Sequence, residues 1–89
     1  MYPIIEKQVL SDIVKLMVIK APLVATRARP GQFLIVRIDE TGERIPLTIA
    51  DSDPAEGTIT LIFQEVGKST RQMGMLEVGE GFQDVVGPL

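Results

Sequence analysis

The sequence predicts an all-β domain, a six-stranded antiparallel Greek-key barrel with one short helix near residues 69–76. Three observations lead to this fold class. Apolar side chains recur with a period of two residues in several short runs, which is the pattern of half-buried strands. Turn-forming residues separate these runs, and 89 residues are enough for one small domain. Closure into a barrel removes the exposed edges that a small open sheet would leave.

The expected strands follow from this alternation. The run from Thr58 to Val66 is the clearest, because Ile59, Leu61 and Phe63 share one face of it. The run from Asp12 to Lys20 places only apolar residues on one face and mostly apolar residues on the other. The six expected strands are Ile4–Val9, Asp12–Lys20, Gln32–Asp39, Ile45–Ala50, Thr58–Val66 and Phe82–Val86.

The connections between these runs carry turn chemistry. Pro30-Gly31 precedes one strand, and Glu40–Glu43 is predicted to be a hairpin turn in which Gly42 supplies a positive φ. Asp51–Gly57 is a polar loop that contains a proline. Its Asp51-Ser52-Asp53 start lacks the later ligands of a calcium loop, so we interpret these acids as loop residues.

Composition excludes several classes of function. Nine basic and twelve acidic residues give a formal charge of −3, without the basic face typical of nucleic-acid-binding proteins. The chain has no cysteine and no histidine, so it lacks a disulfide, a thiol nucleophile and the commonest zinc ligand. The longest apolar stretch, Leu16–Ala25, is too short for a membrane span, and the N-terminus lacks a signal-peptide layout. We expect a cytoplasmic protein that binds neither nucleic acid nor membranes.

One segment departs from the strand pattern. Ser69–Leu76 has helical spacing and is predicted to be a short helix with Ser69 or Thr70 as its N-cap, ended by Gly79 and Gly81. Gly67-Lys68-Ser69-Thr70 is not a phosphate-binding P-loop, because Ile62 stands where that motif needs glycine. A glycine followed by hydroxyls at a helix start still favours phosphate. The alternative is an ordinary N-cap with a solvated lysine.

A second segment, Arg44-Ile45-Pro46-Leu47-Thr48, combines a guanidinium, a rigid proline and a hydroxyl on an apolar strand. Arginine suits bidentate phosphate binding, and a strand hydroxyl can bond the edge of a heterocycle. The alternative interpretation is a rim arginine beside a threonine that favours strands.

Four stretches, taken in chain order, resemble the FAD-binding barrel of the ferredoxin–NADP reductase family. They are Pro30–Phe33, Arg44–Ala50, Glu65–Thr70 and Gly87–Leu89. The nearest branch contains the dihydroorotate dehydrogenase electron-transfer subunit and the small subunit of NADH-dependent ferredoxin–NADP oxidoreductase, also called sulfide dehydrogenase. The match runs over nearly the whole chain. The resemblance implies that residues 1–89 are an FAD-binding β-barrel domain.

The family's first flavin motif is arginine, any residue, tyrosine, then serine or threonine. Thr48 matches the hydroxyl position, which approaches flavin N5, and Leu47 matches the aromatic that covers the ring. Ile45 occupies the arginine position, and Arg44 precedes it by one residue. A one-residue shift on a strand turns a side chain to the opposite face, so a bulge near Pro46 would be needed to aim Arg44 at the diphosphate.

The family's second motif, a glycine followed by serine or threonine at a helix start, cradles the FAD diphosphate and matches Gly67 and Thr70. The preceding strand lines the flavin with backbone groups in the family. The resemblance therefore implies no catalytic and no metal-binding residue in this chain. The cofactor-binding residues that it implies are Arg44, Pro46, Leu47, Thr48, Ile62, Phe63, Gln64, Gly67, Lys68, Ser69 and Thr70.

The resemblance also implies a longer parent, an FAD-dependent oxidoreductase that moves electrons between NAD(P)H, FAD and an iron–sulfur centre or ferredoxin. Its NAD(P)-binding domain and its [2Fe–2S] cluster would lie outside this chain, which we expect to be a fragment unable to oxidise NAD(P)H alone. The expected partners are that missing NAD(P)-binding domain and a larger catalytic oxidoreductase subunit. Two alternatives stay open: a non-catalytic subunit-docking barrel with degenerate flavin motifs, and a riboflavin-synthase-like barrel.

Overall fold

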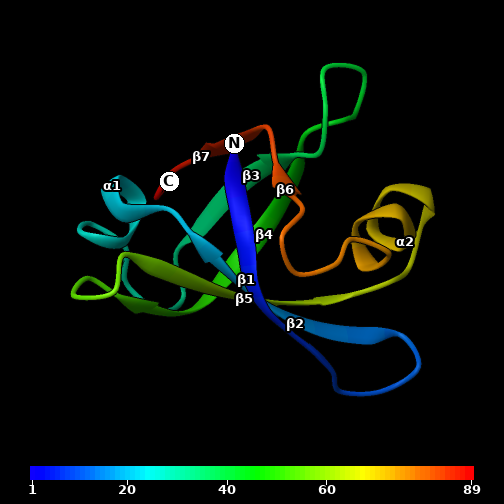
Figure 1. Cartoon of the computed structure of the whole chain (residues 1–89), viewed down its shortest axis with the longest axis horizontal. Coiled ribbons are helices and arrows are strands. Elements are labelled where there is room, and N and C mark those ends of the chain that lie inside the picture. The colour runs from blue at the N-terminus through cyan, green and yellow to red at the C-terminus, as the bar shows by residue number, and fades with distance from the viewer.

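The alternating apolar runs form seven strands, which with two short helices make up the computed structural model of the protein (Figure 1). The structure describes all 89 residues. The elements are β1 (Tyr2–Val9), β2 (Val14–Lys20), α1 (Pro22–Ala25), β3 (Phe33–Arg37), β4 (Ile45–Asp53), β5 (Thr58–Gln64), α2 (Lys68–Gly74), β6 (Gly81–Phe82) and β7 (Asp84–Val86).

The strands form one antiparallel sheet in the order β6-β1-β2-β5-β4-β3-β7. Strands β3, β4 and β5 are consecutive neighbours, and β2 lies beside β5 after the long connection that contains α1. Three hairpin-connected strands and a fourth strand, which joins one end of the three by a long connection and lies beside the strand at the other end, form a Greek key. The predicted all-β, antiparallel Greek-key barrel is therefore confirmed.

The C-terminal segment nearly closes the barrel. Strand β6 pairs with β1 (Tyr2 with Phe82), while β7 pairs with β3 (Arg37 with Asp84). Only Gln83 separates the two short strands, so one stretch of chain serves both edges of the sheet. The Arg37 Nε donates to Asp84 Oδ2 at 2.7 Å across the second of these pairings. The prediction of one strand over Phe82–Val86 is wrong, because the chain changes edge at Gln83.

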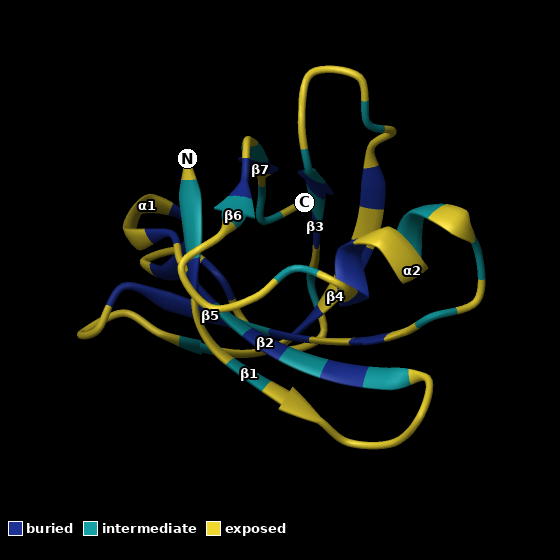
Figure 2. Cartoon of the chain, turned by 45° about the vertical axis from the view of Figure 1, so that its right-hand side comes forward, coloured by how far each residue is buried: buried dark blue, intermediate teal, exposed yellow.

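The barrel interior is one apolar cluster of 18 buried residues (Figure 2). The predicted inward face of β5 is confirmed, since Ile59, Leu61 and Phe63 are all buried. Each of these residues removes apolar area from water and contributes about 1.5–3 kcal/mol to folding. Helix α2 contributes the fully buried Met73 to the same cluster, so the helix is part of the core and not an appendage.

The connections differ from the sequence prediction in three ways. Helix α1, which was not expected, begins at Pro22 and places Val24 and Ala25 in the core. Gly42 does not have the predicted positive φ, because the Asp39 carboxylate forms this turn by accepting from the Thr41 N–H and hydroxyl. Strand β4 also continues to Asp53, three residues beyond the predicted end at Ala50.

Candidate functional site

The two segments singled out in the sequence lie against one pocket. This pocket, of about 230 Å³, lies where β4 begins and α2 begins, and we refer to it as the cation pocket. Arg44 and Lys68 come from its two sides. It is lined by Glu43, Arg44, Ile45, Pro46, Val66, Gly67, Lys68, Ser69 and Thr70. Six of the eleven predicted site residues are therefore brought together: Arg44, Pro46, Gly67, Lys68, Ser69 and Thr70.

Arg44 reaches this pocket without a bulge. The β3–β4 register is regular from Thr48 to Ile45, with Ile35 opposite Pro46 and Val36 opposite Ile45. Strand β4 begins at Ile45, whose side chain is buried, so Arg44 lies just outside the ladder. Strand alternation therefore does not fix where the Arg44 side chain points, and Arg44, which is exposed, lines the pocket from the end of the hairpin.

The start of α2 is organised by Thr70 and not by an N-cap hydroxyl. Gly67 is the N-cap, which replaces the predicted cap at Ser69 or Thr70. The Thr70 Oγ1 accepts from the N–H groups of Val66 at 2.9 Å and Gly67 at 3.0 Å. A hydroxyl at the third helical position thus reaches back to the residues before the helix. The N–H groups of the first helical turn, from Lys68 onward, have no acceptor inside the helix.

Thr70→Ala is therefore expected to lower the free energy of unfolding by about 1–2 kcal/mol, because two N–H groups lose their acceptor. The matched control is Ser69→Ala, one residue away, whose hydroxyl donates to the exposed Glu43 carboxylate. Its expected effect is within about 0.5 kcal/mol. Urea unfolding followed by circular dichroism measures both, and equal effects would contradict this role of Thr70.

The cations of the pocket have no carboxylate partner within the chain. The three ion pairs of the structure join Lys7 to Glu77, Lys15 to Glu65 and Arg37 to Asp84. Arg44 and Lys68 take part in none of them. The one carboxylate that lines the pocket, Glu43, accepts from the Ser69 hydroxyl. Two unpaired cations beside free N–H groups can attract a polyphosphate.

Contacts of Lys7, Lys15 and Glu65 hold α2 in place against the barrel. Lys7 Nζ on β1 donates to the Gly74 carbonyl at 2.8 Å, at the last residue of the helix. Lys15 and Glu65 form a largely buried pair of 3.0 Å. An added Cβ at Gly74 would overlap the Glu65 carboxylate, so the Glu65 side chain lies directly against the helix here. These contacts fix the wall of the pocket that carries Lys68.

An exposed strip on the outer face of β3, β4 and β5 lies beside the pocket. We call it the ring platform, and it consists of Phe33, Thr48 and Ile62. Thr48 is exposed and pairs directly with Phe33, which is 45% exposed. Ile49, the residue after Thr48, pairs with Leu61, so Thr48 lies beside Ile62 across the β4–β5 ladder. Ile62 is 43% exposed. A hydroxyl flanked by an aromatic and an aliphatic side chain can receive one face of a heterocycle.

The remaining predicted site residues divide between the two faces of the sheet. Leu47 and Phe63 are buried in the core, whereas Gln64 is exposed beyond Ile62. Leu47 therefore differs from the expectation that its side chain covers a flavin ring, because strand alternation turns it inward. Phe33 was not predicted as a site residue. It could have been found from the sequence, because it belongs to the Pro30–Phe33 stretch that resembles the family.

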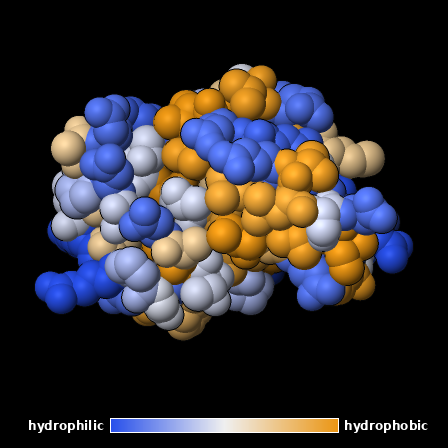
Figure 3. All heavy atoms as spheres, turned by 90° about the horizontal axis from the view of Figure 1, so that it is seen from below, coloured by the Kyte–Doolittle hydropathy of each residue, from blue (hydrophilic) through white to orange (hydrophobic).

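Through Ile62, the ring platform continues into an apolar surface on the outer faces of β2 and β5. Val14, Leu16 and Val18 are half-buried there, and Leu16 pairs directly with the exposed Ile62. In the view from below, apolar side chains gather in one area bordered by polar groups (Figure 3). Such patches are typical of surfaces that contact another protein or domain.

No group of three or more acidic side chains is placed to hold a metal ion. None of the helices has the length and apolar character needed to cross a membrane.

Comparisons with known proteins place these features in a wider group. No protein-family model matches the chain. A Clostridium beijerinckii protein named "uncharacterized protein in adh 3'region" is 52% identical over the whole chain, and the chain covers 30% of that protein. A Thermotoga maritima homolog of the dihydroorotate dehydrogenase B (NAD(+)) electron transfer subunit is 48% identical over 80% of the chain and 25% of its own length. The chain thus spans under a third of the length of these relatives.

Solved structures are also similar over almost the entire chain, and one of them shares a substantial part of the sequence. It is the structure of NADH-dependent reduced ferredoxin-NADP oxidoreductase, described for flavin-based electron bifurcation. The similarity covers 99% of this chain and 32% of that one, with a TM-score of 0.95 and 41% sequence identity.

Proposed function

Because the chain belongs to the ferredoxin–NADP reductase family, in the branch of the dihydroorotate dehydrogenase electron transfer subunits, we propose that it is a flavin-binding barrel of an electron-transfer oxidoreductase. The cation pocket beside the ring platform is the observation that carries this proposal. A flavin dinucleotide combines a flat heterocycle with a diphosphate. The structure offers a matching surface for each part, next to each other along β4.

The residues of the chain fit this cofactor. Arg44, Lys68 and the free N–H groups of the first turn of α2 would hold the diphosphate. Phe33 and Ile62 would cover one face of the isoalloxazine, and Thr48 would present its hydroxyl to the ring edge. Backbone groups of Leu47 and Phe63 would line the same region. When bound, the flavin supplies hydride and single-electron transfer; the protein positions and tunes it.

The longer protein is expected to contain further domains beside this barrel. The relatives extend far beyond the matched segment, and the solved neighbour belongs to a ferredoxin-NADP oxidoreductase. We propose that the whole protein contains an NAD(P)-binding domain and a [2Fe–2S] centre, with FAD as the cofactor of this barrel. The apolar surface on β2 and β5 is suited to contact a larger catalytic subunit.

The same apolar surface favours the second candidate, a non-catalytic docking barrel. Binding of flavins separates the two functions. Riboflavin, FMN and FAD are each titrated into the purified chain, with flavin fluorescence and the visible absorption band as readouts. The proposal expects binding of FAD with a perturbed absorption band. Binding of no flavin contradicts it and leaves the docking function.

A variant of the ring platform tests where the flavin binds. Ile62→Glu is expected to weaken riboflavin and FAD together by about tenfold, because it introduces a charge under the ring. The control is Leu23→Glu on α1, which changes an 85% exposed leucine away from the platform. Equal binding by both variants would place the flavin elsewhere.

A further inference from the structure

The core-facing side of β2 carries one charged residue, Lys15. Met17 and Ile19 on the same side are fully buried, and Lys15 itself is only 8% exposed. Its Nζ donates to Glu65 Oε1 at 3.0 Å and to the Asp12 carbonyl at 3.3 Å. A charge on the buried face of a strand departs from the apolar pattern that specifies the core. Natural proteins make such departures mainly where function requires them.

Stability alone does not account for the buried ion pair. The side chains of Lys15 and Glu65 are 10% and 14% exposed, so both charges are largely removed from water. The cost of that removal is similar to the gain from their attraction, and apolar residues of similar volume often replace such a pair without loss of stability. A buried pair can instead fix a single arrangement of the elements that carry it.

Glu65 connects this pair to both ends of α2. At the start of the helix, only Val66 separates Glu65 from the N-cap Gly67. The Glu65 N–H donates to the Ile13 carbonyl at 2.6 Å, which ties its backbone to the residue before β2. At the end of the helix, the Glu65 carboxylate lies directly against Gly74, where an added Cβ would overlap it. Movement of this side chain would therefore move the helix.

The other contacts of α2 fix its position less closely. Met73 is fully buried, but a methionine side chain adapts to small shifts of its neighbours. Lys7 Nζ donates to the Gly74 carbonyl at 2.8 Å from the end of a long side chain. Glu65 differs from both, because its carboxylate is held by Lys15 and its N–H is held by a backbone carbonyl.

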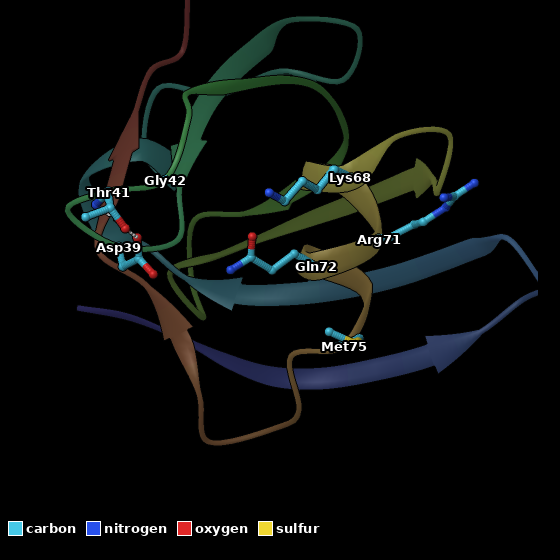
Figure 4. A pocket seen from close by; sticks show the side chains of 7 residues that line it. All are labelled: Asp39, Thr41, Gly42, Lys68, Arg71, Gln72 and Met75. Atoms are coloured by element: carbon cyan, nitrogen blue, oxygen red, sulfur yellow. Dashed lines mark hydrogen bonds between the residues drawn. The ribbon is translucent and has the colours of Figure 1, made fainter.

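The position of α2 determines where Lys68 lies, because Lys68 is the first residue of the helix. The Lys68 and Gln72 side chains extend from α2 toward the β3–β4 hairpin, across a hollow of about 650 Å³ (Figure 4). Lys68 also lines the cation pocket, with Arg44 on the other side. A shift of α2 would change the separation of these two cations. Hydrogen bonds to a bound diphosphate weaken steeply away from their preferred geometry.

We propose that the buried Lys15–Glu65 pair positions α2, and with it Lys68, for the diphosphate of a bound flavin dinucleotide. The proposal rests on the flavin-binding function above and adds two positioning residues that do not line the cation pocket. They act through the helix and do not touch the cofactor. The pair therefore contributes to the affinity for the diphosphate and not to the affinity for the flavin ring.

Replacement of the pair by apolar residues tests this role. In Lys15→Met combined with Glu65→Leu, FAD is expected to bind about tenfold more weakly, with riboflavin unchanged. The urea midpoint of unfolding is expected to stay the same or rise. Lys15→Arg retains a cation beside the Glu65 carboxylate, so its FAD affinity is expected to stay within about threefold of the unmodified chain.

The matched control removes another ion pair. Arg37→Met with Asp84→Leu acts on the β3–β7 pairing, and these residues line neither the cation pocket nor the hollow beside α2. The ratio of FAD affinity to riboflavin affinity is expected to stay constant in this control. The phosphorus NMR signals of bound FAD are expected to shift in the variant of Lys15 and Glu65 but not in the control.

Two results with the apolar variant would overturn the proposal. Equal weakening of FAD and riboflavin would show that the pair acts through folding. Unchanged FAD affinity would show that α2 keeps its position without the pair.

Failure of flavin binding is distinguishable from failure of this inference. If the unmodified chain binds no flavin, the proposed function fails, and inorganic pyrophosphate replaces FAD as the probe. A change of the amide chemical shifts around Lys68 with pyrophosphate in the unmodified chain, but not in the apolar variant, supports the positioning role. The same response in both proteins, or a response in neither, overturns it.

Discussion

Gly81→Ala is expected to lower the free energy of unfolding by about 4 kcal/mol or more, the largest stability effect of any single change proposed for this chain. An added Cβ at Gly81 would lie 2.3 Å from the Tyr2 carbonyl oxygen and 2.8 Å from its carbon. Both are backbone atoms of the β1–β6 pairing, so relief of the clash requires the barrel edge to separate. A domain of this size has a stability of roughly 5–13 kcal/mol in total.

The matched control is Gly67→Ala. An added Cβ at Gly67 meets nothing within 4 Å, and the residue has an extended backbone with φ −153°. This change is expected to cost under about 1 kcal/mol, the difference between glycine and alanine as N-cap. Urea unfolding measures both. Similar losses for the two glycines would show that the β1–β6 seam contributes little to stability.

Removing both cations of the pocket is expected to have the largest effect on ligand binding. Arg44→Ala combined with Lys68→Ala should weaken FAD by about 100-fold, since two charge-assisted contacts to the diphosphate are lost. Riboflavin has no phosphate, so its affinity should not change. Isothermal titration with both ligands gives the ratio. The control is Arg27→Ala with Arg29→Ala, two exposed arginines that do not line the cation pocket.

A change of the carboxylate in the same pocket is expected to alter FAD affinity in the opposite direction. Glu43→Gln removes a negative charge that faces the diphosphate site and keeps an oxygen for the Ser69 hydroxyl. FAD affinity is expected to rise by about threefold or more, with riboflavin unchanged. Losses of both ligands in the double cation variant, or a loss of FAD in Glu43→Gln, would show that these residues act through folding and not through phosphate.

The strands were predictable because burial on one face imposes a period of two on the sequence. Ile59, Leu61 and Phe63 show that pattern, and their inward direction is confirmed. The division of the last strand at Gln83 was not predictable in this way. It depends on which sheet edge each residue meets, and those edges belong to β1 and β3, far away in the sequence. Helix α1 was missed because four residues are too few to show a helical period.

The segments of the candidate site could be identified in the sequence, but the pocket at which they come together could not. Arg44 and Lys68 each had a local signal, and only the Greek-key path brings them to one pocket. The expected bulge was unnecessary, because the first residue of β4 is Ile45 and Arg44 precedes the strand.

The seam made by β6 and β7 has a consequence for folding kinetics. It pairs Tyr2 with Phe82, so almost the entire chain must be ordered before this contact forms. Hairpins such as β1–β2 and β3–β4 involve short loops and form with a small entropic cost. The seam is therefore expected to be absent from the folding transition state. Changes at Gly81 would then accelerate unfolding and leave the folding rate almost untouched.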